Sequence, residues 1–99
     1  MASVVFTLND ETFEWDPIKA QISLMAHGIS FEEACEVFFD PMVIFEADYQ
    51  SPRLRAKGFT ENQTLIIVIF EERDEHYRII TAWKMSKSER RTYEDQTTP

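Results

Sequence analysis

The hydrophobic pattern of the first fifteen residues predicts two short extended segments joined by a turn. Val4–Leu8 is rich in β-branched and aromatic residues, and Thr12–Trp15 is a second short run containing large side chains. Between them, Asn9-Asp10-Glu11 consists of residues that favour turns. Because β-branched and aromatic residues favour the pleated conformation, both segments are expected to be short strands.

A helical period begins after residue 15. Asp16 can cap a helix, and Pro17 suits the first helical position. Gly28 is expected to end this helix in the left-handed conformation, which glycine adopts without strain. Within the helix, apolar residues recur at i, i+4 and i+7 and therefore share one face: Ile18, Ile22 and Met25.

A second short helix follows directly. Ser30 and Glu33 have the spacing of a capping box, in which each side chain binds the backbone N–H of the other residue. Asp40-Pro41 is expected to close the helix. Two short helices joined by a tight glycine turn predict a helical hairpin. The face that is expected to pack inward consists of Phe31, Ala34, Cys35 and Phe38.

The rest of the chain returns to extended patterns and ends in a helix. Ser86 and Glu89 form a second capping box at the start of that helix. The order of elements predicts an α+β domain whose antiparallel sheet has three to four strands. A single domain is expected over residues 1–94, followed by a flexible polar tail over residues 95–99. The expected strands are Met42–Phe45, Leu54–Phe59, the buried apolar run Thr64–Phe70 and, after a turn at Glu71–Glu75, His76–Trp83.

Composition limits the classes of function. With 99 residues the chain has room for one core, and 43% hydrophobic residues are enough to build it. The longest apolar run, Leu65–Phe70, is much shorter than the roughly 20 residues of a membrane-spanning helix, so no membrane partner is expected. The lone cysteine, Cys35, fits a reducing compartment and predicts a cytoplasmic location.

Charge is unevenly distributed around a net value of −8. Residues 1–50 carry ten acidic residues and one basic residue, whereas residues 51–99 carry eight acidic and nine basic residues. Nucleic-acid affinity depends mostly on neutralising phosphates, so this acidic chain is not expected to bind DNA directly. The basic residues of the second half either form a local patch or solvate the surface. The acidic first half could face a basic partner protein. Candidates for binding a substrate are Arg55, Lys84 and Arg90.

Few residues indicate chemistry by themselves. One cysteine and two distant histidines do not supply a zinc site, so neither a metal nor a cofactor is expected. The chain also has no glycine-rich phosphate loop. Cys35 lies on an apolar stripe and is expected to be a buried thiol rather than a nucleophile. His27, at a helix C-terminus, is either an ordinary terminal histidine or a functional residue.

Longer strings of residues carry a resemblance. In the first half they are Phe13-Glu14-Trp15-Asp16-Pro17-x-Lys19-Ala20, His27-Gly28-Ile29-Ser30-Phe31-Glu32-Glu33-Ala34 and Val37-Phe38-x-Asp40-Pro41. In the second half they are Arg53 followed by Gly58, Arg78-Ile79-Ile80-Thr81-Ala82 and Glu89-Arg90-x-x-Tyr93-Glu94. In this order the strings resemble the BrnT toxin family over about residues 6–94, which is nearly the whole chain.

The resemblance implies a RelE-like fold and a bacterial toxin of a type II toxin–antitoxin pair. Such a toxin cleaves RNA without a metal ion and arrests translation, and its partner is an antitoxin of the BrnA kind. Cleavage of this kind needs a base for the ribose 2′-OH, an acid for the leaving oxygen and cations for the charged phosphorane. By matching positions, the candidate catalytic residues are His27, Arg53, Arg78 and Tyr93.

The chain departs from the family pattern at four places. It has Ser23 where the family has Asn, Ala26 where it has Lys, Pro52 where it has Glu, and Thr81-Ala82-Trp83 where it has Ser-Ala-Arg. Two cations expected near the phosphate are therefore absent, and Lys84 is a neighbour that faces the other way if the strand is regular. Two functions stay open: a working ribonuclease toxin, and a catalytically degenerate relative that acts as a protein-binding or regulatory module.

Trp83 also has two interpretations. Regular strand alternation puts it in phase with Tyr77, Ile79 and Thr81, so it is expected to fill the core under the helical hairpin. The alternative is that its ring stacks on an RNA base.

Overall fold

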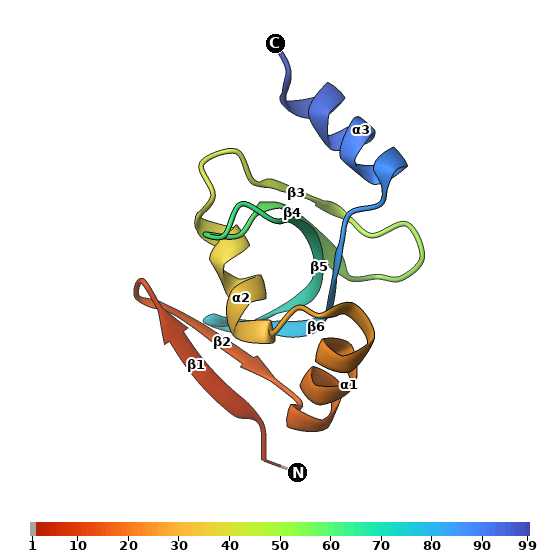
Figure 1. The fold of residues 1–99 in the computed structure, drawn as a ribbon. Helices are drawn as coiled ribbons and strands as arrows, with labels where there is room; N and C mark the ends of the chain where they lie inside the picture. The colour runs from red at the N-terminus through yellow and green to blue at the C-terminus, as the bar shows by residue number, and fades with distance from the viewer. Residues whose placement is uncertain (1) are drawn as a thin grey trace.

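The computed structural model describes residues 2–99 and contains one six-stranded sheet with three α-helices (Figure 1). The strands are β1 (Val4–Leu8), β2 (Glu11–Trp15), β3 (Ile44–Ala47), β4 (Leu54–Phe59), β5 (Leu65–Arg73) and β6 (His76–Lys84). The helices are α1 (Pro17–His27), α2 (Phe31–Glu36) and α3 (Lys87–Thr97), and a 3-10 turn, η1 (Val37–Phe39), continues α2. The α+β class expected from the sequence is confirmed.

All six strands belong to one sheet in the order β1-β2-β6-β5-β4-β3. Four of them, β3 to β6, form the antiparallel part that the sequence predicts. The sheet has six strands rather than three to four, because the predicted N-terminal hairpin joins the same sheet. It does so through a short parallel pairing, in which Phe13 lies opposite Tyr77 and Glu14 opposite Arg78. Such a pairing between distant segments leaves no local signal in the sequence.

The predicted turn and cap residues set the ends of the N-terminal hairpin strands and of α1. Asn9 and Asp10 both have positive φ angles of 49° and 68°, as a tight β-hairpin turn requires. The Asp16 carboxylate accepts hydrogen bonds from the backbone N–H of Ile18 at 2.8 Å and of Lys19 at 3.4 Å. Gly28 ends α1 with a φ of 73°. These turn and cap residues therefore set the ends of the elements, as expected from the sequence.

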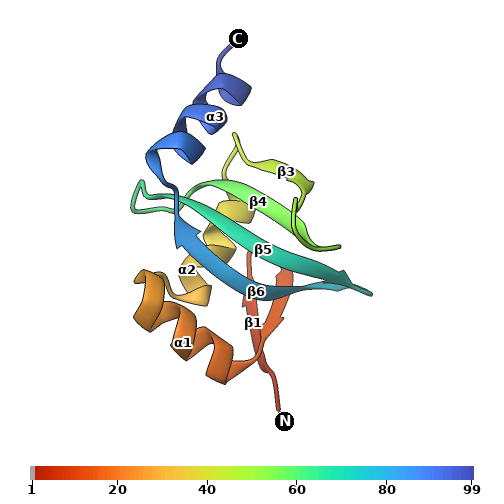
Figure 2. The same ribbon diagram turned by 90° about the vertical axis from the view of Figure 1, so that its right-hand side faces the viewer.

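Helix α1 lies along the part of β6 that β2 leaves unpaired (Figure 2). The Ser23 hydroxyl, which is buried, donates a hydrogen bond of 3.4 Å to the Ala82 carbonyl oxygen on that strand. The apolar face predicted for this helix exists but points to solvent, and Met25 is 78% exposed on it. Both α1 and α2 contact mainly the sheet, so the predicted hairpin is two helices packed on strands rather than on each other.

Helix α2 and η1 cover the hydrophobic core on one face of the sheet (Figure 2). The Ser30 hydroxyl accepts a 3.0 Å hydrogen bond from the Glu33 N–H, which is one half of the predicted capping box. The predicted inward residues Phe31, Ala34 and Cys35 are buried, and Phe38 is partly buried against the core. Core aromatic rings pack edge to face, with the Phe38 and Phe70 centroids 4.9 Å apart.

A β-bulge in β6 changes the side on which its last residues lie. Ile69 pairs with Thr81, but the next residue of β5, Phe70, pairs with Ile79, so Ile80 has no partner of its own. Tyr77 and Ile79 therefore pack with the core, whereas Thr81 and Trp83 point to the opposite face. The expectation that Trp83 fills the core under the helices was wrong, because the bulge shifts the alternation by one residue.

Strand β5 is longer than predicted, and β3 begins later. Residues 71–73, expected to be part of a turn, continue β5, and only Asp74 and Glu75 form the turn into β6. Strand β3 begins at Ile44 rather than Met42. Charged residues fit the far end of β5 because that end lies at the exposed rim of the sheet.

Helix α3 begins with the predicted capping box between Ser86 and Glu89. Residues 95–97, which the sequence assigned to a polar tail, form the last turn of this helix. The helix crosses one end of the sheet and projects beyond it (Figure 1). Tyr93 holds it there, since this residue is buried against Phe59. No helix within residues 2–99 has the length and hydropathy to span a membrane.

Candidate functional site

The strand register brings cations, aliphatic residues and Trp83 together on the face opposite α2. Arg55 of β4 lies opposite Ile69 of β5, which lies opposite Thr81 of β6. In the next such row along the strands, Lys57 is followed by Ile67 and Trp83. We call this surface the open face, because α2 and η1 lie on the other side of the sheet (Figure 2).

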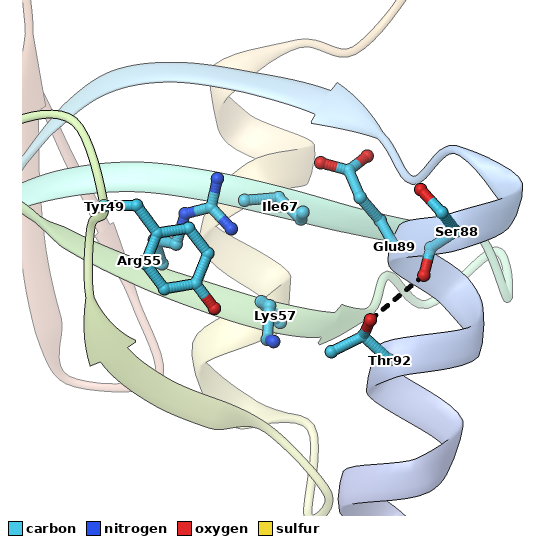
Figure 3. A pocket seen from close by; sticks show the side chains of 7 residues that line it. All are labelled: Tyr49, Arg55, Lys57, Ile67, Ser88, Glu89 and Thr92. Carbon is cyan, nitrogen blue, oxygen red and sulfur yellow. Dashed lines mark hydrogen bonds between the residues drawn. The ribbon is translucent and has the colours of Figure 1, made fainter.

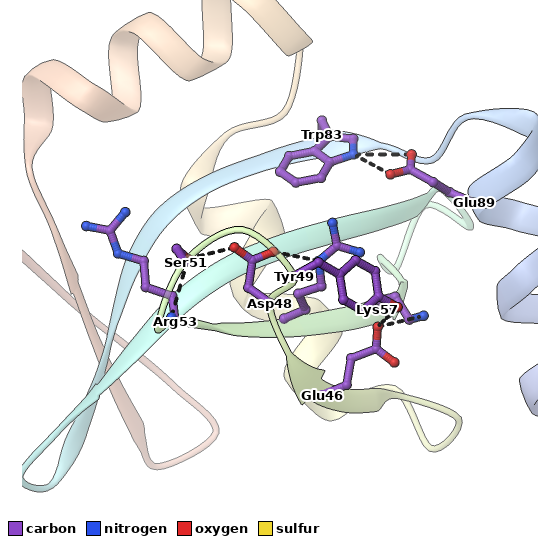
Figure 4. Close-up of polar contacts among 9 residues, drawn as sticks. Glu46, Asp48, Tyr49, Ser51, Arg53, Lys57, Trp83 and Glu89 are labelled. Carbon is purple, nitrogen blue, oxygen red and sulfur yellow. Dashed lines mark hydrogen bonds and ion pairs between the residues drawn. The ribbon is translucent and has the colours of Figure 1, made fainter.

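A groove of about 550 Å³ runs over the open face (Figure 4). One wall is the loop between β3 and β4, whose shape is fixed by its own hydrogen bonds. The Ser51 hydroxyl donates to the Asp48 carboxylate at 2.6 Å and accepts from the Arg53 N–H at 3.3 Å. The lining residues are Asp48, Gln50, Ser51, Arg53, Arg55, Ile69, Ile80, Thr81, Trp83 and Glu89.

A smaller hollow of about 200 Å³ continues the groove towards α3 (Figure 3). Arg55 and Glu89 line both hollows. The other lining residues of the smaller one are Tyr49, Lys57, Ile67, Ser88 and Thr92. The first turns of α3 therefore border one end of the open face.

Arg55 is held rigidly in this site. Its Nε atom lies 3.0 Å from an Asp48 carboxylate oxygen. Its guanidinium carbon lies 4.7 Å from the centroid of the Tyr49 ring and 5.8 Å from that of Trp83. The hydrogen bond from Ser51, followed by that from Arg55, holds the pKa of Asp48 below its usual range. The charged Asp48 carboxylate therefore fixes the Arg55 guanidinium beside the Tyr49 and Trp83 rings.

Lys57 serves to attach α3 to the sheet. Its side chain is only 4% exposed, and its Nζ lies 3.1 Å from Glu46 and 2.6 Å from the Gln96 side-chain oxygen. Burial raises the pKa of Glu46, but hydrogen bonds from Gln96 and Lys57 outweigh that effect and bring the pKa below its usual value. The charge of Lys57 is thus balanced within the protein.

Arg53, the last residue of the loop before β4, is more exposed than the two basic side chains of that strand, Arg55 and Lys57. Its side chain is 36% exposed, and its Nε lies 4.0 Å from the Glu71 carboxylate, at the limit of an ion pair. A partner this distant and this solvated contributes little to holding the guanidinium. Arg53 is therefore the cation of the groove that is best placed to meet an anionic ligand.

Arg78 lies at a different part of the sheet, next to β2. Its Nη1 atom lies 3.3 Å from a Glu14 carboxylate oxygen and 3.2 Å from the Ser3 hydroxyl. His76 contacts the same Glu14 oxygen at 3.2 Å. Burial raises the pKa of Glu14, but the hydrogen bonds from His76 and Arg78 outweigh that effect and bring the pKa below its usual value. Arg78 does not line either hollow of the open face.

The other residues proposed from the sequence have diverse surroundings. His27 is exposed at the end of α1, one turn beyond Ser23 and therefore towards the end of β6. Lys84 pairs with Ile66 of the core, so it projects from the side opposite to Trp83. Arg90 is exposed on α3. Tyr93 is only 3% exposed, and its hydroxyl donates to the Met42 carbonyl oxygen at 3.4 Å.

Donor side chains for a metal do not gather anywhere in residues 2–99. Cys35 is buried, as expected, and burial raises the pKa of its thiol far above the usual value. A thiol with so high a pKa stays protonated and is a poor nucleophile.

Comparison with known proteins assigns the chain to a family. A family described as the ribonuclease toxin, BrnT, of type II toxin–antitoxin systems matches residues 15–89. The chain belongs to the BrnT family. This match includes His27, Arg53 and Arg78, whereas Arg90 and Tyr93 lie just beyond it. Membership implies that an antitoxin protein is the partner of the chain.

The fold is also that of a solved BrnT structure. The chain is similar to the ribonuclease toxin BrnT of Brucella abortus, whose crystal structure was determined at 1.1 Å resolution. The TM-score is 0.62 and the identity 24%, over 74% of this chain and 94% of that chain. Among curated protein sequences, no match is found.

Several residues of the groove were not foreseen from the sequence. Asp48, Tyr49 and Ser51 lie in a loop without periodicity, and no motif of the BrnT resemblance includes them. Glu89 was predicted as a cap and as part of a BrnT-like string, but not as a residue of the groove. It also accepts hydrogen bonds from the Trp83 indole N–H, at 3.3 Å to each carboxylate oxygen. At the position that the resemblance compares with an arginine, the chain thus has an indole bound to a carboxylate.

Proposed function

We propose that this protein is the toxin of a type II pair and arrests translation by cleaving RNA on the open face of its sheet. Cleavage is proposed to need no metal ion. The proposal deepens the family assignment, which gives a ribonuclease toxin without a mechanism.

The observation that carries this proposal is the meeting of Arg53, Arg55 and Trp83 in one groove. RNA offers phosphates, which guanidinium groups bind, and bases, which aromatic rings bind by stacking. A groove of about 550 Å³ that contains both kinds of group on a rigid sheet suits a single-stranded segment.

In the proposed reaction the ribose O2′ attacks the adjacent phosphorus, and the bond from phosphorus to O5′ breaks. A base takes the proton of the 2′-OH, and an acid gives a proton to the departing O5′. His27 is the proposed proton carrier, since an imidazole both accepts and donates protons near neutral pH. Arg53 is proposed to hold the phosphorane oxygens, with Arg55 beside it. Arg78, which is paired with Glu14 outside the groove, is given no contact with the phosphorane.

The proposed partner is a BrnA-like antitoxin that covers the groove. A cover over Arg53 and Trp83 would exclude RNA without changing the toxin. The ten acidic residues among positions 1–50 suit a partner with basic segments.

Growth after induced expression without an antitoxin tests this function. Wild-type protein is expected to stop growth, and Arg53→Ala to restore it, because loss of one transition-state contact commonly slows catalysis about 100- to 1000-fold. Arg91→Ala is the matched control, since this arginine is exposed on α3 and lines neither hollow. Normal growth with soluble wild-type protein would count against a toxin.

A second candidate function is a catalytically degenerate BrnT relative that binds a protein. It is favoured by the ion pairs that occupy the cations of this surface: Arg55 with Asp48, Lys57 with Glu46, and Arg78 with Glu14. Trp83 and Ala26 at positions of expected cations point the same way. A protein that captures a BrnA-like partner but leaves both growth and purified RNA unaffected would identify this second function.

A further inference from the structure

Trp83 has surroundings that differ from those of a core residue. The bulge at Ile80 turns its side chain onto the open face, where it lines the groove. Trp15, the other tryptophan, is 2% exposed within the core. A large aromatic ring on the groove side of a sheet is in the right place to contact a ligand.

The indole is held at its edge by hydrogen bonds, and the Arg55 guanidinium lies over its ring, 5.8 Å from the centroid. Its Nε1–H donates to both oxygens of Glu89, and Glu89 in turn accepts a 2.9 Å hydrogen bond from the Ser86 N–H. Ser86 and Glu89 are the capping box of α3, so the start of that helix holds the ring in one orientation (Figure 4). A ring held in this way can stack on a ligand with little loss of side-chain entropy.

The groove next to the ring has an aliphatic floor and a cation at its far end. Ile69 and Ile80 line the groove together with Trp83 and Arg53 and form its aliphatic floor. Trp83 lies in the row of Lys57, which is four residues after Arg53, or about 13 Å along the strand direction at roughly 3.3 Å per residue, and it lies two strands, or about 10 Å, across the sheet. Arg55 lies midway between them. This spacing leaves room for a flat group on the indole and an anionic group at Arg53.

We propose that Trp83 is a nucleobase-stacking residue, so that the groove takes single-stranded RNA with one base on the indole and a nearby phosphate at Arg53. The inference rests on the proposed function and adds a base subsite to it. It also gives a role to the position at which the chain has lost an arginine: recognition by stacking replaces recognition by charge. Stacking tolerates any base, so the subsite selects an unpaired base rather than a sequence.

Binding of an RNA that cannot be cleaved tests the subsite directly. The probe is a fluorescently labelled 2′-O-methyl adenylate octamer, whose blocked oxygen cannot attack phosphorus, and inorganic triphosphate is the probe without bases. Trp83→Ala is expected to weaken octamer binding roughly 5- to 100-fold while leaving triphosphate binding unchanged. Arg53→Ala is expected to weaken binding of both probes.

Trp83→Phe distinguishes stacking from a merely structural role. Phenylalanine keeps an aromatic face but loses the hydrogen bond to Glu89, so stacking predicts that most octamer affinity returns. If only the hydrogen bond matters, the Phe and Ala variants will bind equally weakly, and the inference falls. Phe45→Ala, at an exposed aromatic residue outside the groove, is the matched control and is expected to bind like wild type.

Tryptophan fluorescence gives a second measurement of the same contact. An unlabelled octamer is expected to quench wild-type emission on binding, and to leave the emission of Trp83→Phe, which retains only the buried Trp15, unchanged. If the octamer saturates the wild-type protein without quenching its emission, the base subsite is overturned.

The binding measurements separate this subsite from RNA binding as a whole. If Trp83→Ala binds the octamer as wild type does while Arg53→Ala does not, the subsite fails and RNA binding stands. If wild-type protein binds no octamer at all, both proposals fail.

Discussion

At the scale of single residues, Trp83 changes the chemistry of the groove most. An arginine there would give a second guanidinium beside Arg53, whereas the indole gives an apolar surface and one N–H donor. That donor is bound to Glu89. The remaining charge for a phosphate comes from Arg55 of β4, which is paired with Asp48, and from the more exposed Arg53 in the loop before that strand.

Tyr93 is a residue for which sequence and structure suggest different roles. The family resemblance makes it a catalytic candidate, but it is buried against Phe59 and its hydroxyl binds the Met42 carbonyl oxygen. Burial, and to a lesser degree the charge of Asp40, raise the pKa of Tyr93, so its hydroxyl remains protonated. These contacts attach α3 to the sheet.

Replacing Tyr93 by phenylalanine separates the two roles. Tyr93→Phe keeps the ring in place and removes one long hydrogen bond, so the free energy of unfolding is expected to fall by about 0.5–1.5 kcal/mol in urea denaturation. Cleavage of RNA by the folded variant is expected to equal that of wild type. A loss of 100-fold or more in cleavage, with little change in stability, would instead make Tyr93 catalytic.

Local signals at single residues were predictable because they act over a few positions. Asp16 and Gly28 determine the ends of α1, and Ser86 caps α3, through contacts within four residues. The side on which Trp83 lies was not predictable in the same way. It depends on how β6 pairs with β5 at Ile80, and no residue near Trp83 in the chain signals that bulge.

At the scale of elements, the position of the groove depends on β4 and on the loop before it. That strand carries Arg55 and Lys57 on the open face, the loop carries Arg53, and Ala56 and Gly58 face η1 and the core. The sequence predicted β4 with the correct bounds because its pattern is local. The loop of residues 48–53 was not predictable, since its shape comes from side-chain hydrogen bonds of Asp48 and Ser51.

Gly58 is the point at which β4 comes closest to η1. A Cβ atom there would lie 2.7 Å from an Asp40 carboxylate oxygen and 3.3 Å from a methyl carbon of Val37. The same Asp40 oxygen accepts a 2.7 Å hydrogen bond from the Phe59 N–H, so it is not free to move away.

Gly58→Ala is therefore expected to lower the free energy of unfolding by about 1–3 kcal/mol, a common cost of overpacking. Chemical denaturation followed by circular dichroism would measure it. An unchanged denaturation midpoint would show that Asp40 can leave its place without cost, and that η1 is not held to β4 in the way described.

At the scale of the whole molecule, the site is assembled from consecutive elements of the second half of the chain: the loop before β4, the strands β4, β5 and β6, and the first turns of α3. Their common position follows from the antiparallel order β4-β5-β6 and from the capping box that turns α3 towards Trp83. The family resemblance indicated Arg53 and Arg78 as partners in one site. The fold places Arg53 in the groove and Arg78 beside β2 with Glu14, because the hairpin β1–β2 joins the sheet at that point.

Charge at this scale also bears on function. A chain with a net charge of −8 repels RNA at long range, so binding depends on the few cations that face the groove. If these cations suffice, the protein is a ribonuclease in spite of its acidity. If they do not, the protein keeps the BrnT fold without ribonuclease activity, and its ligand is the partner protein.

Cleavage of RNA by the purified protein, free of antitoxin and in the presence of a metal chelator, tests whether the open face is a metal-independent ribonuclease site. Wild-type protein is expected to produce defined RNA fragments under these conditions, Arg91→Ala to do the same, and Arg53→Ala to cut about 100- to 1000-fold more slowly. Intact RNA with folded wild-type protein, or equal cleavage by the Arg53→Ala variant, would contradict a metal-independent ribonuclease site on the open face.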